Sequence, residues 1–453
     1  MTLLLPADAS SAIPVWCVDA GTWPALSGDL PEPAADFARA SGFAAKPGQL
    51  CLLPGAGGLH GVLYGLDPAA GPFGPGKLAD LLPAGSYRLA GALADPALAA
   101  LSWCLTGYRF GRYRDRPAPE ARLAAPEGVD VGEIGRVAAA VAAGRDLVNT
   151  PANDLGPAEI AAAAQALAAR YGGACTVTIG DDLAAGFPMI AAVGRASDRA
   201  PRLVDVTWGP PDAPRVTLVG KGVSFDTGGL DIKPSSAMLL MKKDMAGAAV
   251  ALAAAEMVMG AGLPVRLRLL IPTVENAISG AAFRPGDVLR SRQGLTVEIG
   301  NTDAEGRLIL ADALSLADEE APELLIDFAT LTGAARTALG PDLPALFTED
   351  DALAAEMAEA GAAVADPVWR LPLWAPYRSM LDSKIADINH VSGGPFAGAV
   401  TAALFLRRFA ARAKAHAHLD LYGWNPSTKP GRPEGGEVQT ARLVHALLRR
   451  RYG

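Results

Sequence analysis

Short apolar runs alternate with longer alanine-rich stretches through most of the chain. The runs are rich in Val, Leu and Ile, which is typical of buried strands, and they cover residues 215–220, 265–271, 295–299, 324–328 and 418–422. Helical stretches at residues 245–259 and 305–318 follow the first and third runs. This alternation predicts an α/β domain with a largely parallel sheet covered by helices.

The first part of the chain carries a weaker version of the same pattern. Strand-like pieces at residues 15–18, 49–53 and 87–90 alternate with alanine-rich stretches, and a glycine-rich run at residues 55–61 is predicted to be a turn. Residues 116–128 (RPAPEARLAAPEG) indicate a linker. We therefore expect a smaller N-terminal α/β domain over residues 1–125. A larger catalytic domain over residues 126–453 would begin with a connecting helix, at residues 129–148, that Pro151 ends.

Composition narrows the class of protein. Half of the 453 residues are hydrophobic and 19% are charged, so large cores are expected. A net charge of −8 argues against non-specific nucleic-acid binding, which needs a basic face. No basic stretch precedes the apolar N-terminal run, so no secretory signal is expected. The apolar stretch at residues 246–265 carries Glu256, which favours a buried helix over a membrane span. Four scattered cysteines are typical of free thiols in a reducing compartment, so we expect a cytoplasmic protein.

Chemistry-bearing residues follow several of the predicted strands. Lys221 follows the first strand, Asn301 and Asp303 follow the third, and residues 330–333 follow the fourth. Ligands of parallel α/β sheets bind beyond the carboxyl ends of the strands. The placement of these residues therefore indicates a functional site.

Two segments, residues 219–245 and 301–308, combine carboxylates, lysines, an arginine and several glycines. Oxygen ligands suit hard or borderline divalent cations, and Asp303 and Glu305 would share one side of an extended chain. Neither segment contains histidine, and the chain has no H-E-x-x-H or G-x-S-x-G motif. A histidine-ligated zinc protease and a serine hydrolase therefore lack support. The spacing around Lys221 also does not match a P-loop.

The sequence NTDAEGRL at residues 301–308 resembles the signature of the leucyl (cytosol) aminopeptidases. Residues 220–244 resemble the metal-binding loop of the same family, and the resemblance continues at residues 327–334, 369–374 and 381–387. It covers roughly residues 145–425. The N-terminal third is only loosely similar, in YRFGRY at residues 108–113.

This resemblance implies a set of roles. Two divalent metal ions per subunit, zinc or manganese before magnesium or cobalt, would be bound by Lys221, Asp226, Asp244, Asp303 and Glu305. Lys233 and Arg307 would be catalytic, with a bicarbonate held at Arg307. The substrate would contact Met241, Asn301, Thr330, Leu331 and Gly333. The resemblance further implies peptide substrates with apolar, leucine-like N-terminal residues, and a hexamer whose six active sites face an enclosed interior.

Several residues also have simpler interpretations. Asp226 could belong to a turn and Asp303 could cap a helix. Met241 could be a core residue, whereas the resemblance makes it a pocket wall. The side chains of Lys242 and Lys243 are expected in solvent, and His390 is expected at the surface. Two departures from the family pattern, Ala399 and Lys243, leave the side-chain preference of the enzyme open.

Two other functions stay open on the residues. A two-metal phosphoesterase uses similar carboxylates and lysines. The other alternative is a binding protein, either a DNA-associated regulator or an inactive scaffold. The acidic composition and the intact ligand set argue against a binding role.

Overall fold

The computed structural model describes residues 3–6, 11–91 and 93–453. It divides the chain into two compact units. The N-terminal unit comprises Met1–Ala142 and Ser427–Glu434, and the catalytic unit comprises Ala143–Pro426 and Gly435–Gly453. The chain therefore leaves the first unit, builds most of the second, and returns to the first.

The N-terminal unit is built on a mixed sheet with the strand order β1-β6-β5-β2-β4-β3. Its strands are β1 (Leu4–Leu5), β2 (Ile13–Val18), β3 (Leu50–Gly55), β4 (Gly58–Gly65), β5 (Gly85–Ala90) and β6 (Ala121–Ala124). Its helices are α1 (Trp23–Asp29), α2 (Glu32–Ala40), the 3₁₀ segment η1 (Pro68–Lys77), α3 (Leu78–Leu81) and α4 (Pro96–Thr106). The predicted strands overlap β2, β3 and β5, and the glycine-rich run covers the end of β3, the turn itself and the start of β4.

The predicted linker at residues 116–128 is wrong in part, because it contains β6. Ala121 and Leu123 are fully buried, and β6 pairs in parallel with both β5 and β1. The prolines that suggested a linker lie on either side of this short strand, where proline does not interrupt the ladder.

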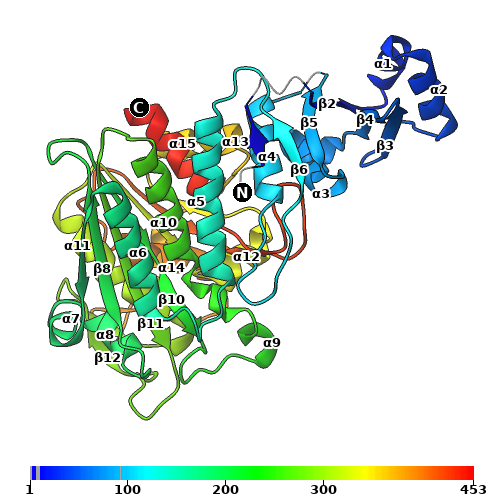
Figure 1. Cartoon of the computed structure of the whole chain (residues 1–453). Coiled ribbons are helices and arrows are strands. Elements are labelled where there is room, and N and C mark those ends of the chain that lie inside the picture. The colour runs from blue at the N-terminus through cyan, green and yellow to red at the C-terminus, as the bar shows by residue number, and fades with distance from the viewer. Residues whose placement is uncertain (1–2, 7–10, 92) are drawn as a thin grey trace. The chain divides into compact units, whose positions relative to one another are not determined.

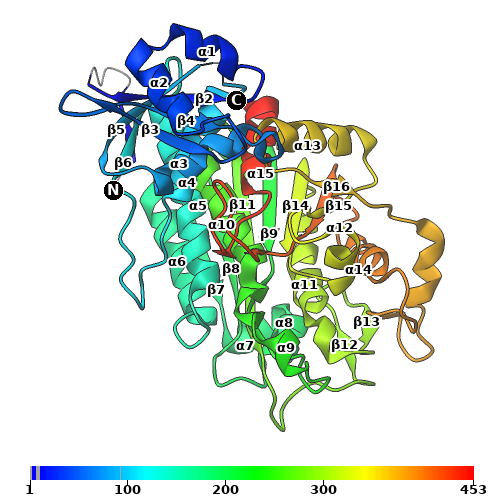
Figure 2. The ribbon, with the colours of Figure 1, turned by 90° about the vertical axis from the view of Figure 1, so that its right-hand side faces the viewer.

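The catalytic unit contains a larger, mostly parallel sheet with the order β16-β15-β18-β14-β9-β11-β8-β7, and β10 also pairs with β11. Its strands are β7 (Ala174–Thr178), β8 (Arg202–Trp208), β9 (Arg215–Gly220), β10 (Gly222–Asp226), β11 (Arg266–Asn276), β14 (Leu324–Ala329), β15 (Ala345–Phe347), β16 (Trp369–Arg370) and β18 (His416–Asp420). Strands β11, β9 and β14 run parallel side by side (Figure 2), and β18 pairs in parallel with β14. The predicted α/β class, with a smaller N-terminal part followed by a larger one, is confirmed.

Helices cover both faces of this sheet. On one face α6 (Pro157–Tyr171) and α10 (Ala246–Gly260) lie side by side (Figure 1). On the other, α8 (Pro188–Gly194), α11 (Glu305–Glu319) and α14 (Gly398–Arg407) pack around a core of aliphatic side chains. The remaining helical segments are α5 (Val131–Asn149), α7 (Gly180–Gly186), α9 (Ser235–Met238), η2 (Met241–Met245), η3 (Thr302–Ala304), α12 (Gly333–Leu339), α13 (Asp351–Ala363), η4 (Ala375–Leu381) and α15 (Ala441–Tyr452).

Helix α10 is buried along most of its length, as predicted for this apolar stretch. Among the described residues, no helix combines the length and apolar character that a membrane span requires.

One predicted strand lies elsewhere. β13 (Thr296–Glu298) belongs to a separate small sheet with β12 (Val288–Arg290) and β17 (Ile388–Asn389), and not to the main sheet. Its apolar residues alternate with the half-buried Thr296 and Glu298, which suits a sheet with one solvated face. A further pair of short strands joins β19 (Trp424–Asn425) to β20 (Gly435–Gly436).

Candidate metal centre

The carboxyl ends of the parallel strands meet at one edge of the catalytic sheet, and a cavity of about 130 Å³ opens there. Segments that follow β9, β10, β14 and β18 line it, together with η2 and η3. Its lining includes the predicted residues Lys221, Asp226, Lys233, Met241, Asp244, Asp303, Thr330, Leu331 and Gly333. Three predicted residues lie outside the lining, namely Asn301, Glu305 and Arg307.

Three buried carboxylates form the centre of the site. Asp226, Asp244 and Glu305 each offer an oxygen within 4.8 Å of the others. They come from the end of β10, from η2 and from the first residue of α11. The helix begins beside Lys221, and Gly306 makes this possible because a Cβ there would stand 2.5 Å from Lys221 Cε.

Two lysines lie between the carboxylates. Lys221 Nζ is 2.8 Å from Asp244 Oδ2 and 3.0 Å from Glu305 Oε1, and it donates to the carbonyl oxygen of Thr330. Lys233 Nζ is 2.8 Å from Asp226 Oδ2 and pairs closely with Asp303. Each ammonium therefore bridges two carboxylates and occupies a position between them where another cation could lie.

The structure also tests the two simpler interpretations, a turn at Asp226 and a helix cap at Asp303. Asp226 does accept from the backbone N–H of Gly228, so it belongs to a turn as well as to the cluster. The same oxygen accepts from Asn276 Nδ2, a contact that no local sequence pattern predicts. Asp303 is not the helix cap, because the side chain of Asn301 accepts from the Asp303 N–H at the start of η3.

The electrostatics of the cluster favour additional positive charge. Burial and the neighbouring Asp226 carboxylate raise the pKa of Glu305 well above its usual range. Burial and Asp244 likewise raise the pKa of Asp226 to about 6. Burial would raise the pKa of Asp244 too, but the adjacent Lys221 holds it below its ordinary value. Carboxylates crowded in this way lower their mutual repulsion by binding cations.

The donor atoms fit divalent metal ions. Among the described residues, the groups that lie against the buried oxygens Asp244 Oδ2, Asp303 Oδ1 and Glu305 Oε1 are the ammonium groups of Lys221 and Lys233. Buried carboxylate oxygens are costly unless cations compensate them, so these oxygens suit positively charged ligands. Oxygen-rich donor sets suit magnesium and manganese, and zinc also accepts carboxylates.

Arg307 lies behind this cluster and contacts His390. Its Nη1 donates to the His390 carbonyl oxygen at 2.7 Å, while its buried Nε has no partner among the described residues. Burial lowers the pKa of Arg307 to about 10. The prediction that His390 lies at the surface is wrong, because the ring is completely buried against Phe405. Burial, together with Arg307, lowers the pKa of His390 to about 3, so the ring is neutral.

The segment after β14 forms the other side of the cavity. Asp420 fixes it, since its carboxylate accepts from the N–H groups of Leu331 and Thr332 and from the Thr332 hydroxyl at 2.6 Å. The prediction that the side chain of Lys243 lies in solvent is also wrong, because Lys243 is only 4% exposed. Sequence reasoning missed this lysine because its local context, Lys242-Lys243-Asp244, is typical of a charged surface.

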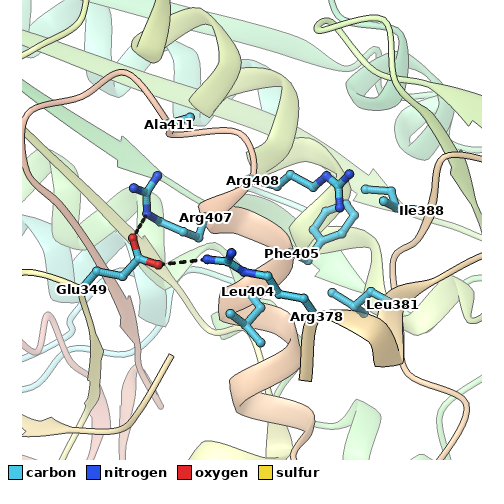
Figure 3. Close-up of a pocket in the computed structure, with 9 residues that line it drawn as sticks. All are labelled: Glu349, Arg378, Leu381, Ile388, Leu404, Phe405, Arg407, Arg408 and Ala411. Atoms are coloured by element: carbon cyan, nitrogen blue, oxygen red, sulfur yellow. Dashed lines mark hydrogen bonds and ion pairs between the residues drawn. The ribbon is translucent and has the colours of Figure 1, made fainter. Parts of the chain in front are cut away.

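Another cavity of about 450 Å³ lies elsewhere in the catalytic unit (Figure 3). Glu349 accepts there from Arg378 and Arg407, and Leu404 and Phe405 also line the cavity. A single carboxylate that two arginines already neutralise offers no comparable place for metal ions.

Comparison with known proteins agrees with this geometry. Residues 142–448 match the model of the cytosol aminopeptidase family catalytic domain, and residues 23–126 match that of the M17 aminopeptidase N-terminal domain. A probable cytosol aminopeptidase of Roseiflexus castenholzii is 42% identical over 76% of this chain and 74% of its own length.

Two solved structures are also similar. The crystal structure of cytosol aminopeptidase from Coxiella burnetii covers all of both chains at 44% identity, with a TM-score of 0.96. The bottromycin maturation enzyme BotP in complex with Mn is 38% identical, with a TM-score of 0.87 over 97% of this chain and 99% of its own.

Fold, site and comparisons together define a metallo-aminopeptidase. The chain belongs to the cytosol aminopeptidase family, and its enzyme type is that of the leucyl aminopeptidases. It therefore acts on peptides.

Proposed function

We propose that this enzyme removes the N-terminal residue from peptides with a free α-amine, using two divalent metal ions. The observation that carries the proposal is the buried cluster of Asp226, Asp244 and Glu305, whose oxygens lie within 4.8 Å of one another. Lys221 and Asp303 would complete the ligand set. The ammonium groups now between these oxygens support the assignment, because they show where positive charge is stabilised.

Lys233 and Arg307 would have separate catalytic roles beside the metal ions. When bound, the two ions polarise the scissile carbonyl and lower the pKa of the attacking water. Lys233, which is partly accessible from the cavity, would donate to the oxygen that becomes negative during the reaction. The unpartnered Nε of Arg307 supports a role in holding a planar anion such as bicarbonate, which would accept the proton of the water.

Substrate contacts follow from the cavity lining. Met241, Leu331 and Leu421 give it apolar surface, which supports an apolar, leucine-like N-terminal residue. Thr330 and Gly333 would position the peptide backbone along the same edge. Asn301 lies outside the lining but caps η3, the segment that contains Asp303, and it would contact the substrate from there.

Four further expectations belong to this proposal. Zinc or manganese would be the resident metal, with magnesium and cobalt as alternatives, and the Mn complex of BotP supports a divalent ion. The subunits would form hexamers. The protein would work in the cytoplasm, which the names of its relatives support. The domain boundary would lie between residues 125 and 126.

The decisive test compares a leucyl peptide with its N-acetylated form, after chelation and reloading with each metal. We expect cleavage of the free-amine peptide alone, increasing towards mildly alkaline pH because the α-amine titrates near ~8. Comparable turnover of both peptides would refute the aminopeptidase assignment. Hydrolysis of a phosphate ester in preference to either peptide would establish the two-metal phosphoesterase instead.

A further inference from the structure

Two cations line the metal-centre cavity without belonging to the cluster of carboxylates. Lys243 Nζ lies 4.6 Å from the centre of the Tyr422 ring, and Arg336 Cζ lies 5.5 Å from the same ring. All three side chains line the cavity. The tyrosine ring therefore holds two positive groups at one wall, by contacts that cations make favourably with aromatic faces.

These two cations differ from the lysines of the metal cluster. Lys221 and Lys233 each pair with two carboxylates, whereas no carboxylate among the described residues forms an ion pair with Lys243 or Arg336. The nearby Asp420 forms no ion pair with either cation, and its oxygens accept from Leu331 and Thr332. A buried lysine that lines a cavity and has no direct ion-pair partner gains from an anionic ligand.

Arg336 also lies beside the predicted substrate edge. It is on α12, one turn after Gly333, and its Nε and Nη2 lie 3.9 Å from the position that a Cβ on Gly333 would occupy. A guanidinium group binds carboxylates through two parallel N–H groups.

We infer that Lys243 and Arg336 recognise a carboxylate of the peptide substrate, so that peptides with a carboxylate close to the N-terminal residue are preferred. This inference rests on the proposed aminopeptidase function. The carboxylate has two possible sources in a peptide. It is either the side chain of an N-terminal Glu or Asp, which would replace the expected apolar preference, or the C-terminus of a dipeptide, which would leave that preference intact.

Two pairs of nearly isosteric substrates separate the sources. The p-nitroanilides of Glu and Gln differ in side-chain charge, and Leu-Gly and Leu-Gly-amide differ in C-terminal charge. Hydrogen bonds to charged groups are worth enough to predict that kcat/KM favours the charged member of one pair by about tenfold to a hundredfold. The pair that shows the preference identifies the source.

Variants test which residues cause the preference. Arg336→Met and Lys243→Met should each bring the charged-to-neutral ratio of kcat/KM towards one, and Arg336→Glu should invert it. Arg336 is exposed, so its variants should fold even if burial makes Lys243→Met unstable. Lys242→Met is the matched control, because the Lys242 ammonium donates instead to the carbonyl oxygen of Asn149 and should not affect the ratio.

The outcomes are distinct. A ratio near one for both pairs in the unaltered enzyme, with the neutral substrates still cleaved, overturns this inference and leaves the aminopeptidase intact. A charge preference that survives Arg336→Glu also overturns it. Failure to cleave any free-amine substrate overturns the proposed function and this inference together.

Discussion

The two units of the molecule use the same kinds of elements, yet their interiors differ. Among the described residues of the N-terminal unit, the buried polar side chains are the uncharged Ser102 and Thr106. The catalytic unit buries many charged groups, among them Lys221, Glu305 and Arg307. Burying a charge is costly, and the described core of the first unit contains none, so the buried charges of the second unit need a separate explanation.

The buried charges of the catalytic unit are themselves of two kinds. Some are balanced: Arg145 pairs with Glu437 at 2.7 Å, and Asp327 accepts from His416 and His418. Burial opposes ionisation of Asp327, but His418 and His416 hold its pKa at about 2. The metal-centre carboxylates are instead crowded together, and burial and this crowding raise the pKa of two of them, Asp226 and Glu305. Closely spaced carboxylates therefore distinguish the proposed metal centre, whereas the ion-paired charges belong to the structure that surrounds it.

The variants Glu305→Gln and Asp303→Asn are expected to have the largest effect, and they test directly whether the crowded carboxylates bind metal. Each removes one negative charge from the crowded group with little change in shape, so we expect activity to fall to the background rate while the fold persists. Elemental analysis should find fewer than two metal ions per chain, and circular dichroism should match the unaltered enzyme. Full metal occupancy in both variants would contradict the ligand roles.

The two cluster lysines should respond differently to arginine. An amine coordinates a metal only through its lone pair, so as a metal ligand Lys221 would have to lose its proton. A guanidinium offers no lone pair at working pH, and Lys221→Arg should therefore lose a metal and its activity. Lys233→Arg keeps a positive donor and should retain more activity and both metals. Equal behaviour of the two variants would show that the assigned roles are wrong.

Arg307→Ala should have a smaller effect than loss of a ligand. Arg307 contacts His390 and no carboxylate oxygen of the cluster, so both metals should stay bound. Positioned proton transfer contributes about 10²–10⁴-fold, and turnover should fall within that range. The measurements are kcat and metal content on the same preparation. A missing metal would place Arg307 among the groups that maintain the cluster.

Ser102→Ala is expected to have the smallest effect, a small loss of stability with no loss of activity. It serves as the control from the N-terminal unit. Its hydroxyl donates to the Phe73 carbonyl oxygen at 2.7 Å within an uncharged core. Loss of one such bond costs about 1 kcal/mol of unfolding free energy, which urea unfolding measures. Metal content and kcat should not change. A large loss of activity would show that the uncharged unit also contributes to the chemistry.

Much of the fold and site was predictable because the relevant patterns are local. The strands at residues 215–220 and 324–328 are continuous apolar runs, and Lys221 and the segment after Phe328 follow them directly. β13 was assigned to the wrong sheet because an alternating run does not specify its partner strands. Lys243 and His390 were misjudged because residues distant in sequence, Tyr422 and Phe405, bury them.

The return of the chain to the N-terminal unit has a consequence for its biosynthesis. Within that unit, the Gly431 N–H donates to Thr106 Oγ1 at 2.7 Å, so a segment made late joins a core made early. During translation, residues 1–142 are synthesised long before Ser427–Glu434. The hydrogen bond between Gly431 and Thr106 therefore cannot form in the nascent N-terminal unit until nearly all of the catalytic unit has been translated. Maturation of both units is thus tied to completion of the same late stretch of chain.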